Sequence, residues 1–342
     1  MQTKRNTWRT LLVIAVVAVL GIALIGGDKQ VLASGDAIKG KIVIKVGFEP
    51  NPGEPTELSA REWARLVKEK SDGKVELQIY PSSQLGSKKD LIEQATMGIN
   101  VITITDFSFL AEYVPDFNVL AGPYMGDDFD DIFKLTETDW FKDLSKQLDD
   151  KGIHILTTNW AFGVRHMIAK KPVYKPADLN GQKIRVSNNK MFLESFKAMG
   201  ATPIPMPWGE AYTAITQGVI DGCDNPLPFL YGAKIHEAAK YVILTGHMNM
   251  ISQWVIGRNY WESLPDKVKT ILVEAADEAG MYNNKIVAEA DKEMLEKYRQ
   301  EGITIVEPDR EAFREATKGV YRSFPEWTPG LYDEVMSLLG EK

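Results

Sequence analysis

The strongest constraint on the fold is a regular alternation of strand-like and helix-like patterns in the first third of the chain. Runs that alternate apolar and polar residues are separated by stretches with apolar residues at helical spacing, which stop at Asp72-Gly73 and Gly98. The predicted strands occupy 42–46, 75–79 and 101–105; one predicted helix has its apolar face over 60–67 and continues to Asp72-Gly73, and the next occupies 88–97. This β-α-β-α-β order predicts a parallel sheet with helices on its faces.

A second unit with the same alternation starts near Ile153. It contains the predicted strands HILTTNW and QKIRVS, a helix with Phe192, Phe196 and Met199 on one side, and a further helix, GEAYTAITQG. A strand at 251–258, the strand ITIV and helices around 310–323 and 331–339 complete the pattern. Two α/β units in one chain predict two domains around a cleft.

The region Pro265–Arg299 is rich in Ala, Glu and Lys and predicts one very long helix. A helix of some 30 residues is about 45–50 Å long, enough to cross both domains, although a break near Gly280 is an alternative. We expect domain I to comprise 41–161 plus 250–290, and domain II 162–249 plus 291–342. The hinge is expected near Trp160–Phe162 and Met248–Met250, where the chain crosses between them.

The N-terminus has the three-part pattern of a secretory signal. Basic residues precede the apolar segment Leu11–Ile25, and small residues at Val31 and Ala33 predict cleavage after Ala33. About 15 apolar residues fall short of the roughly 20 that a spanning helix needs, so a retained membrane anchor is the weaker alternative. We therefore expect export to the periplasm of a mature chain spanning residues 34–342.

Charge and cysteine content argue against a nucleic-acid-binding protein and against a fold held together by disulfides. The formal net charge of -7 argues against nucleic acid as a partner. The single cysteine cannot form an internal disulfide, so the exported chain must be stabilised by its hydrophobic cores.

Catalytic and cofactor motifs are absent from the sequence. It contains no HExxH, GxSxG, phosphate-loop, GxGxxG or CxxC pattern, and its four histidines lack the spacing of metal ligands. Cys223 lies in DGCDNP, which we interpret as a polar turn after a helix, and a cysteine of this kind more often fills buried space than acts as a nucleophile. We predict no enzyme activity, no cofactor and no metal.

Arg185 is the strongest candidate for ligand binding that the residues themselves provide. It lies in the predicted strand 183–186, just before a helix that begins near Asn188 or Asn189. In open α/β sheets, ligands bind beyond the carboxyl ends of strands, where helix N-termini also offer free amides. The planar guanidinium can hold a carboxylate through two parallel hydrogen bonds, whereas a surface ion pair is the alternative role.

Four longer phrases resemble the solute-binding subunit of TRAP transporters, the DctP family, and its sialic-acid-binding branch in particular. They are KSDGKVELQIYPSSQLGSKKDLIEQATMG, PADLNGQKIRVSNN, GATPIPMPWGEAYTAITQGVIDGCDNP and LPDKVKTILVEAADEA. The resemblance implies a periplasmic-binding-protein-like α/β fold with two domains around a cleft. It also implies a monomer that captures an organic acid and delivers it to the TRAP membrane permease subunits.

The same resemblance implies roles for individual residues. Arg185 matches the arginine that holds the ligand carboxylate, Arg165 matches a second site arginine, and Asn225 matches the asparagine of the family phrase DGQENP. Trp208 falls where an aromatic residue faces the ligand, and Phe162 would add a second apolar face. Further site positions are Glu49, Lys88 and Asp106 from domain I, and Asn188 at the predicted helix start.

Each of these residues has a structural alternative. Trp208 could fill core space, Arg165 could orient a neighbouring carboxylate, and Glu49, Lys88 and Asp106 could be solvated loop residues. Rival functions are an exported enzyme using Glu49, Asp106 or His166 as a base, and the binding protein of an ABC importer or a sensor. Two arginines predict a carboxylate ligand, and the acidic Glu49 and Asp106 favour one that bears hydroxyl or amino groups.

Overall fold

The computed structural model describes residues 38–340, so the predicted signal segment lies outside the described residues. These residues form one nine-stranded sheet in the order β2-β1-β3-β8-β4-β7-β5-β6, with β9 paired to β8. The strands are β1 (Ile42–Gly47), β2 (Val75–Tyr80), β3 (Val101–Thr105), β4 (Ile153–Ala169), β5 (Lys183–Val186), β6 (Thr202–Pro205), β7 (Gly222–Pro226), β8 (Tyr241–Gly257) and β9 (Thr304–Val306).

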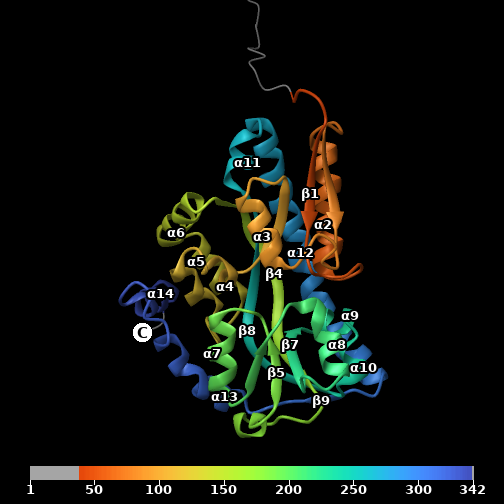
Figure 1. Ribbon diagram of the computed structural model, residues 1–342, viewed down its shortest axis with the longest axis vertical. Helices are drawn as coiled ribbons and strands as arrows, with labels where there is room; N and C mark the ends of the chain where they lie inside the picture. The colour runs from red at the N-terminus through yellow and green to blue at the C-terminus, as the bar shows by residue number, and fades with distance from the viewer. Residues whose placement is uncertain (1–37, 341–342) are drawn as a thin grey trace, which may run out of the picture. The chain divides into compact units, whose positions relative to one another are not determined.

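Helices cover both ends of this sheet (Figure 1). The α-helices are α2 (Pro55–Lys70), α3 (Lys88–Thr96), α4 (Phe107–Leu110), α5 (Phe129–Thr136), α6 (Asp139–Asp150), α7 (Lys190–Ala198), α8 (Ala211–Thr216), α9 (Leu227–Gly232), α10 (Ile235–Ala238), α11 (Arg258–Ser263), α12 (Asp266–Gln300), α13 (Arg310–Thr317) and α14 (Leu331–Leu339). Four 3₁₀ segments are η1 (Pro115–Ala121), η2 (Pro176–Leu179), η3 (Trp208–Glu210) and η4 (Lys318–Arg322). Within the described part of the chain, no helix is both long and apolar enough to cross a membrane.

The sheet has a parallel set of strands at each end and an antiparallel pair in the middle. Strand β1 pairs in parallel with β2 and β3, and β5 pairs in parallel with β6 and β7. The long strands β4 and β8 run antiparallel between these sets. We call β1–β3 with α2–α4 the first half, and β5–β7 with α7–α9 the second half (Figure 1). The parallel arrangement predicted for the first three strands is therefore confirmed, whereas the central strands β4 and β8 are antiparallel.

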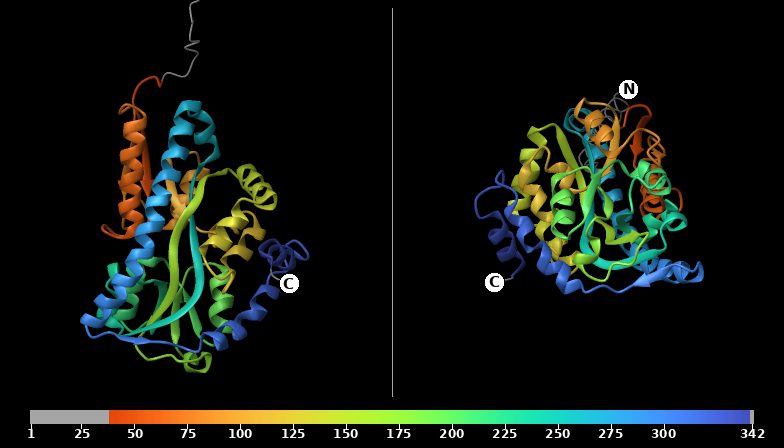
Figure 2. Two further views of the ribbon diagram at one scale, coloured as in Figure 1. Left: turned by 180° about the vertical axis from the view of Figure 1, so that it is seen from behind. Right: turned by 60° about the horizontal axis from the view of Figure 1, so that its bottom comes forward.

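Helix α12 runs without interruption over 35 residues. It lies along β4 in the view from behind (Figure 2). Trp63 and Trp160 each donate an indole hydrogen bond to a backbone carbonyl of α12, at 3.1 and 2.9 Å. The predicted alternative of a break near Gly280 is wrong: a Cβ there would lie 2.2 Å from Asn159 Oδ1, so this glycine allows the close approach of β4.

Three predicted elements differ from the structure. The stretch DGCDNP, predicted as a polar turn, contains the fully buried strand β7, because partners elsewhere in the fold satisfy its polar groups. The strand predicted at 251–258 is only the second part of β8, which begins at Tyr241. The helix predicted over GEAYTAITQG is divided into η3 and α8.

The two segments predicted to contain the hinge lie beside one another in the sheet. Gly163 pairs with Met250 and Arg165 with Met248, and the β4 register shifts between Ala161 and Gly163. At this irregularity Asn284 of α12 accepts a hydrogen bond from the Ala161 N–H at 2.7 Å and donates one to the Asn159 carbonyl at 2.8 Å. The Asn284 side chain thus bonds two backbone groups of β4 next to the point where the β4–β8 register shifts.

Candidate functional site

A cavity lies between the two halves and contains about 420 Å³ of space between atoms, part of it open to solvent. We call it the central cavity. Its lining residues are Glu49, Pro50, Lys88, Ile104, Asp106, Phe162, Arg165, Arg185, Ser187, Trp208, Asn225 and Phe229. Eight of the nine predicted site residues line the central cavity. The ninth, Asn188, is exposed and lines an adjoining cavity of about 500 Å³, together with Glu49, Lys88 and Arg185.

The topology explains why residues so far apart in the sequence meet here. Glu49 follows β1, and Asp106 directly follows β3, the strand parallel to β1. Arg185 lies in β5 and Asn225 in the parallel neighbour β7. Because parallel strands end at the same edge of a sheet, each half brings its polar side chains to one edge. Arg165 of the central strand β4 lies between the two sets.

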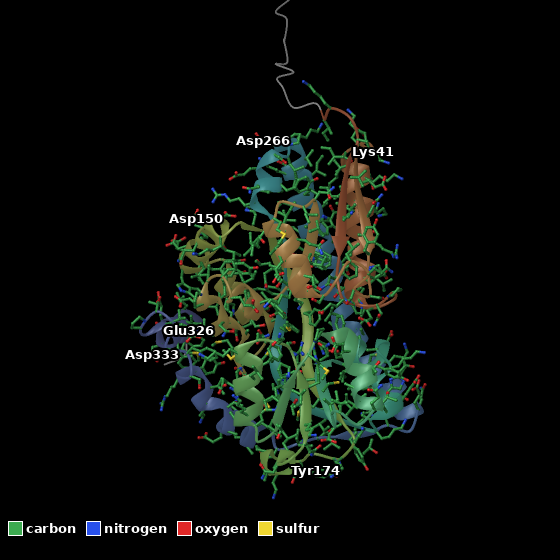
Figure 3. The ribbon with its side chains drawn as sticks, in the orientation of Figure 1. Lys41, Asp150, Tyr174, Asp266, Glu326 and Asp333 are labelled. Atoms are coloured by element: carbon green, nitrogen blue, oxygen red, sulfur yellow. The ribbon has the colours of Figure 1, made fainter. Side chains whose placement is uncertain are left out.

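Arg185 is a buried cation without a carboxylate partner. Most charged side chains lie at the outside of the fold, as those labelled in Figure 3 do, whereas Arg185 is only 4% exposed. Its Nε and Nη2 donate to the Met206 carbonyl at 2.9 and 2.7 Å, and the guanidinium lies over the Trp208 ring. None of the ion pairs among residues 38–340 includes Arg185. The edge formed by Nη1 and Nη2 therefore retains N–H donors for a ligand.

Burial lowers the pKa of Arg185, while the charges of Asp224 and Glu49 act in the opposite direction. An arginine stays protonated even so, because its ordinary pKa lies far above neutral pH. A buried guanidinium with only a backbone carbonyl as partner is costly to desolvate. An anion that entered the central cavity would reduce this cost.

Arg165 differs from Arg185 because its donors already have partners. Its Nε donates to Asp224 Oδ2 at 2.6 Å and its Nη2 to the Asp224 carbonyl at 3.0 Å. Nη1 donates to Asn225 Oδ1 at 2.8 Å. The structure thus shows the predicted alternative, in which Arg165 orients a neighbouring carboxylate, and still places this arginine in the wall of the cavity.

Asp224 and His247 complete a buried network behind the cavity. His247 Nε2 lies 3.2 Å from Asp224 Oδ2, and its Nδ1 lies 2.8 Å from Thr245 Oγ1. Burial raises the pKa of Asp224, but Arg165 and the hydrogen bond from His247 outweigh burial and hold that pKa below its ordinary range. Burial lowers the pKa of His247. Because the amide orientation of Asn225 is fixed by Arg165, its Nδ2 donor is left for the cavity.

The first half contributes a second ion pair. Lys88 Nζ lies 2.7 Å from Asp106 Oδ2, and both side chains are largely buried. Asp106 is also the N-cap of α4, where its Oδ1 accepts hydrogen bonds from the Ser108 N–H, at 3.0 Å, and from the Ser108 hydroxyl. Burial raises the pKa of Asp106, but the opposing effects of Lys88, Ser108 and Arg165 are together larger and hold that pKa below its ordinary value. The carboxyl is therefore ionised at neutral pH. Lys88 and Asp106 are therefore paired, largely buried side chains and not solvated loop residues.

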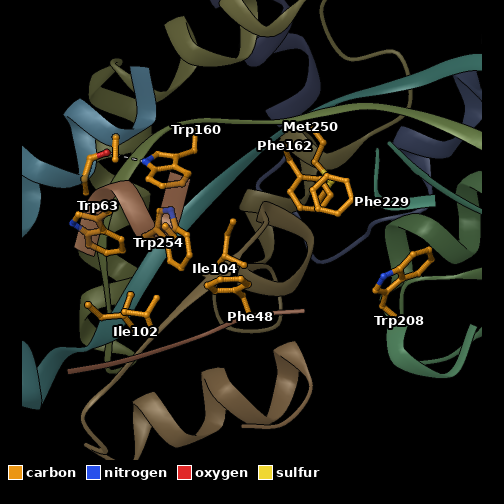
Figure 4. Packing of buried hydrophobic residues seen from close by; sticks show 14 of the residues in the cluster. Phe48, Trp63, Ile102, Ile104, Trp160, Phe162, Trp208, Phe229, Met250 and Trp254 are labelled. Atoms are coloured by element: carbon orange, nitrogen blue, oxygen red, sulfur yellow. Dashed lines mark hydrogen bonds between the residues drawn. The ribbon is translucent and has the colours of Figure 1, made fainter. Parts of the chain in front are cut away.

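Aromatic rings form the apolar part of the wall. Phe162 stacks on Phe229 with ring centroids 4.3 Å apart, and Met250 packs beside them (Figure 4). Trp208 lies on another side of the cavity, 7% exposed, and belongs to the same hydrophobic cluster. It therefore both fills core space and faces the cavity.

Cys223 and His166, which the sequence offers as a possible nucleophile and a possible base, are both poorly suited to these roles. Burial raises the pKa of the Cys223 thiol to about 12, which makes the reactive thiolate scarce at neutral pH. Burial lowers the pKa of His166 to about 3, and its Nδ1 accepts a hydrogen bond from the Gly246 N–H at 3.0 Å. Neither residue lines the central cavity.

Comparison with known proteins agrees with this architecture. Residues 46–326 match the model of the DctP family, described as bacterial extracellular solute-binding protein, family 7. The chain belongs to this family. The matched segment contains every residue that lines the central cavity, and the predicted fold class and family are confirmed.

Solved structures of TRAP periplasmic solute-binding proteins resemble this family 7 chain closely. One from Ochrobacterium anthropi, with bound L-fuconate, is 47% identical with a TM-score of 0.86, covering 88% of this chain and all of that one. Another from Actinobacillus succinogenes, with bound L-galactonate, is 40% identical with a TM-score of 0.86, covering 87% and 99%. The sialic acid-binding periplasmic protein SiaP of Vibrio cholerae is 29% identical, over 86% of this chain and 91% of its own.

Sequence reasoning missed several residues of the site. Phe229, Ser187 and Ile104 line the cavity, Asp224 accepts hydrogen bonds from Arg165, and His247 contacts that same carboxylate. Asp224 is adjacent to the predicted Asn225, but nothing in the local pattern indicates that its carboxylate meets an arginine 59 positions earlier.

Proposed function

We propose that this protein captures a sugar acid of the aldonate class and that Arg185 binds the carboxylate of that ligand. The observation that carries the proposal is the buried guanidinium of Arg185, which lines the central cavity and takes part in no ion pair of the described chain. A carboxylate fits the Nη1–Nη2 edge with two parallel hydrogen bonds. Such a pair offsets the desolvation of both charges.

The remaining wall favours a hydroxylated ligand over a simple dicarboxylate. Across from Arg185, the first half presents Glu49, Lys88 and Asp106, which together offer both donors and acceptors to hydroxyl groups. A second carboxylate would meet the negative charges of Glu49 and Asp106. Trp208 and the stacked Phe162 suit the C–H faces of a carbon chain. The two structures cited above with bound L-fuconate and L-galactonate support the same class of ligand.

In this proposal the ligand is bound in the periplasm by a monomer, released unchanged, and passed to TRAP membrane permease subunits. Signal cleavage after Ala33 frees the mature chain. Residues 41–161 with 250–290, and 162–249 with 291–342, form the two domains that close on the ligand. Arg165 adds positive potential to the cavity instead of making the main carboxylate contact, because its donors are held by Asp224 and Asn225.

Calorimetry with a small set of compounds tests the proposal. We expect L-fuconate and L-galactonate to bind, and L-fucitol, which has the hydroxyl chain of L-fuconate without the carboxylate, to show no binding. Sialic acid and succinate test the competing ligand classes. Tighter binding of succinate than of either aldonate, or equal binding of L-fucitol, would contradict the proposal. NMR of L-fuconate after long incubation should show no product, and a new compound would support the enzyme alternative.

A further inference from the structure

One hydrogen bond joins the two halves next to the central cavity. The Asn189 side chain donates from Nδ2 to the Ser108 hydroxyl oxygen at 2.9 Å. Ser108 lies in α4, which follows β3 of the first half, and Asn189 caps α7, which follows β5 of the second half (Figure 1). Both residues are buried, at 2% and 8% exposure. While the halves are together, water therefore cannot easily replace the hydrogen bond between the Asn189 amide and the Ser108 hydroxyl.

The direction of every hydrogen bond in this chain of contacts is determined. Asn189 Oδ1 accepts from the Phe192 N–H at 3.1 Å, which leaves the amide nitrogen to face Ser108. The ionised Asp106 can only accept, so the Ser108 hydroxyl must donate to it and offer a lone pair to Asn189. Asp106 in turn holds Lys88 in the cavity wall. The contacts thus run from the helix cap of one half to the charged pair of the other.

We propose that Ser108 and Asn189 are positioning residues that couple closure of the two halves to the placement of Asp106 and Lys88 against the ligand. Separation of the halves breaks the Asn189–Ser108 bond and leaves the Ser108 hydroxyl held by Asp106 alone. Closure restores the bond, restrains that hydroxyl and so fixes the carboxylate that faces the cavity. This inference rests on the proposed capture of a sugar acid in the central cavity.

A positioning role of this kind affects escape of the ligand more than its arrival. The ligand enters before the bond forms, so the association rate should depend little on it. Dissociation requires the halves to separate and the bond to break. Loss of one net hydrogen bond between uncharged groups corresponds to roughly a three- to tenfold faster dissociation.

Asn189→Ser separates this role from helix capping. Serine caps a helix about as well as asparagine, but its side chain is shorter and lacks the amide donor. We expect the melting temperature of the ligand-free variant to equal that of the parent, and the dissociation rate of L-fuconate, measured by stopped-flow fluorescence, to rise roughly three- to tenfold. Asn180→Ser, at an exposed position between η2 and β5, is the matched control and should leave both quantities unchanged.

Ser108→Ala provides the second arm, because it removes the acceptor from the other side. In a double-mutant cycle, Asn189→Ser should increase the dissociation rate much less in the Ser108→Ala background than in the parent. The inference would be overturned by an unchanged dissociation rate in Asn189→Ser, or by effects of the two substitutions on that rate that simply multiply in the double variant. In either case, binding of an aldonate by the parent would still uphold the proposed function. Failure of the parent to bind either aldonate would reject the proposed function, and the inference with it.

Discussion

Arg185 and Arg165 show that the role of a buried arginine depends on which of its donors are already used. Arg165 donates through all three of its nitrogens to Asp224 and Asn225. Arg185 donates only to the Met206 carbonyl, so its positive charge is not neutralised by a neighbour. Arg165 therefore stabilises the wall of the cavity, whereas Arg185 has no anion beside it to offset the cost of burying its charge.

We predict opposite effects of Arg185→Gln on ligand binding and on stability. Loss of the charged pair should weaken L-fuconate binding by about 2–5 kcal/mol in calorimetry, because the carboxylate would lose its charge-assisted hydrogen bonds. The ligand-free variant should melt at the parent temperature or above it, because an unpaired buried charge has been removed. Lys183→Ala, an exposed position of the same strand, removes one positive charge and should change neither property. Full affinity in Arg185→Gln would show that the carboxylate binds elsewhere.

The sequence ranks Arg185 above Arg165, through its place at a strand end and through the family resemblance, but does not give the physical reason for that rank. The rank depends on Asp224, which reaches Arg165 only because β7 pairs with β4. Ser108 and Asn189 were also beyond sequence reasoning, since their contact joins residues 81 positions apart. What the local pattern does contain is the start of a helix near Asn189, and the structure confirms this residue as the N-cap.

At the scale of elements, local periodicity predicts β1, α2, β2, α3 and β3 well, because each buries apolar residues against a hydrophobic core; that of α3 differs from the one shared by the other four. It fails where polar residues are buried with partners from distant strands. Strand β7 resembles a turn because it begins with glycine and contains Asp224 and Asn225. The first part of β8 contains Gly246 and His247, which interrupt the apolar pattern, so its full length is not visible in the sequence.

The contact of Asn284 with β4 gives a prediction for the crossing helix. Asn284→Ala removes the acceptor of the Ala161 N–H and the donor to the Asn159 carbonyl. Leaving a buried backbone group without a partner costs about 1–3 kcal/mol, and we expect the free energy of unfolding to fall by that amount in urea titrations. Lys285→Ala, at the exposed neighbouring position, is the control and should have no effect. Equal stabilities for the two variants would mean that β4 does not depend on this side chain.

At the scale of the whole molecule, Glu54 places a buried carboxyl where the first half approaches α9 of the second half. It precedes α2 and touches Gly232 of α9, where an added Cβ would lie 2.1 Å from Glu54 Oε1. Asn51 donates to Oε1 at 3.0 Å, whereas Oε2 is buried and has no hydrogen-bond partner in the described chain. Burial raises the pKa of Glu54 to about 8, and repulsion from Glu57 adds to the effect.

A raised carboxyl pKa makes the folded state less stable as the pH increases. The contribution of Glu54 is fully present below pH 4.5, its unfolded pKa, and is lost as the pH rises through about 8. We expect Glu54→Gln to match the parent at pH 4.5 and to exceed its free energy of unfolding by about 1.4 kcal/mol per pH unit above that, with a plateau beyond the folded pKa. Urea titrations from pH 5 to 9 measure this difference, with the exposed Glu274→Gln as control. A constant difference across that range would exclude Glu54 as the titrating group.

The three elements that pass between the halves, β4, β8 and α12, also determine how the molecule can move. One covalent connection would permit rotation in any direction, but β4 hydrogen-bonds to both β8 and α12, and three connections held together in this way resist twisting and sliding. Bending about a single axis across them is the deformation left, and the register shift at Ala161 lies on it. We therefore expect any movement between the halves to be mainly a bend about this axis, and the proposed ligand to act on that bend by contacting both halves.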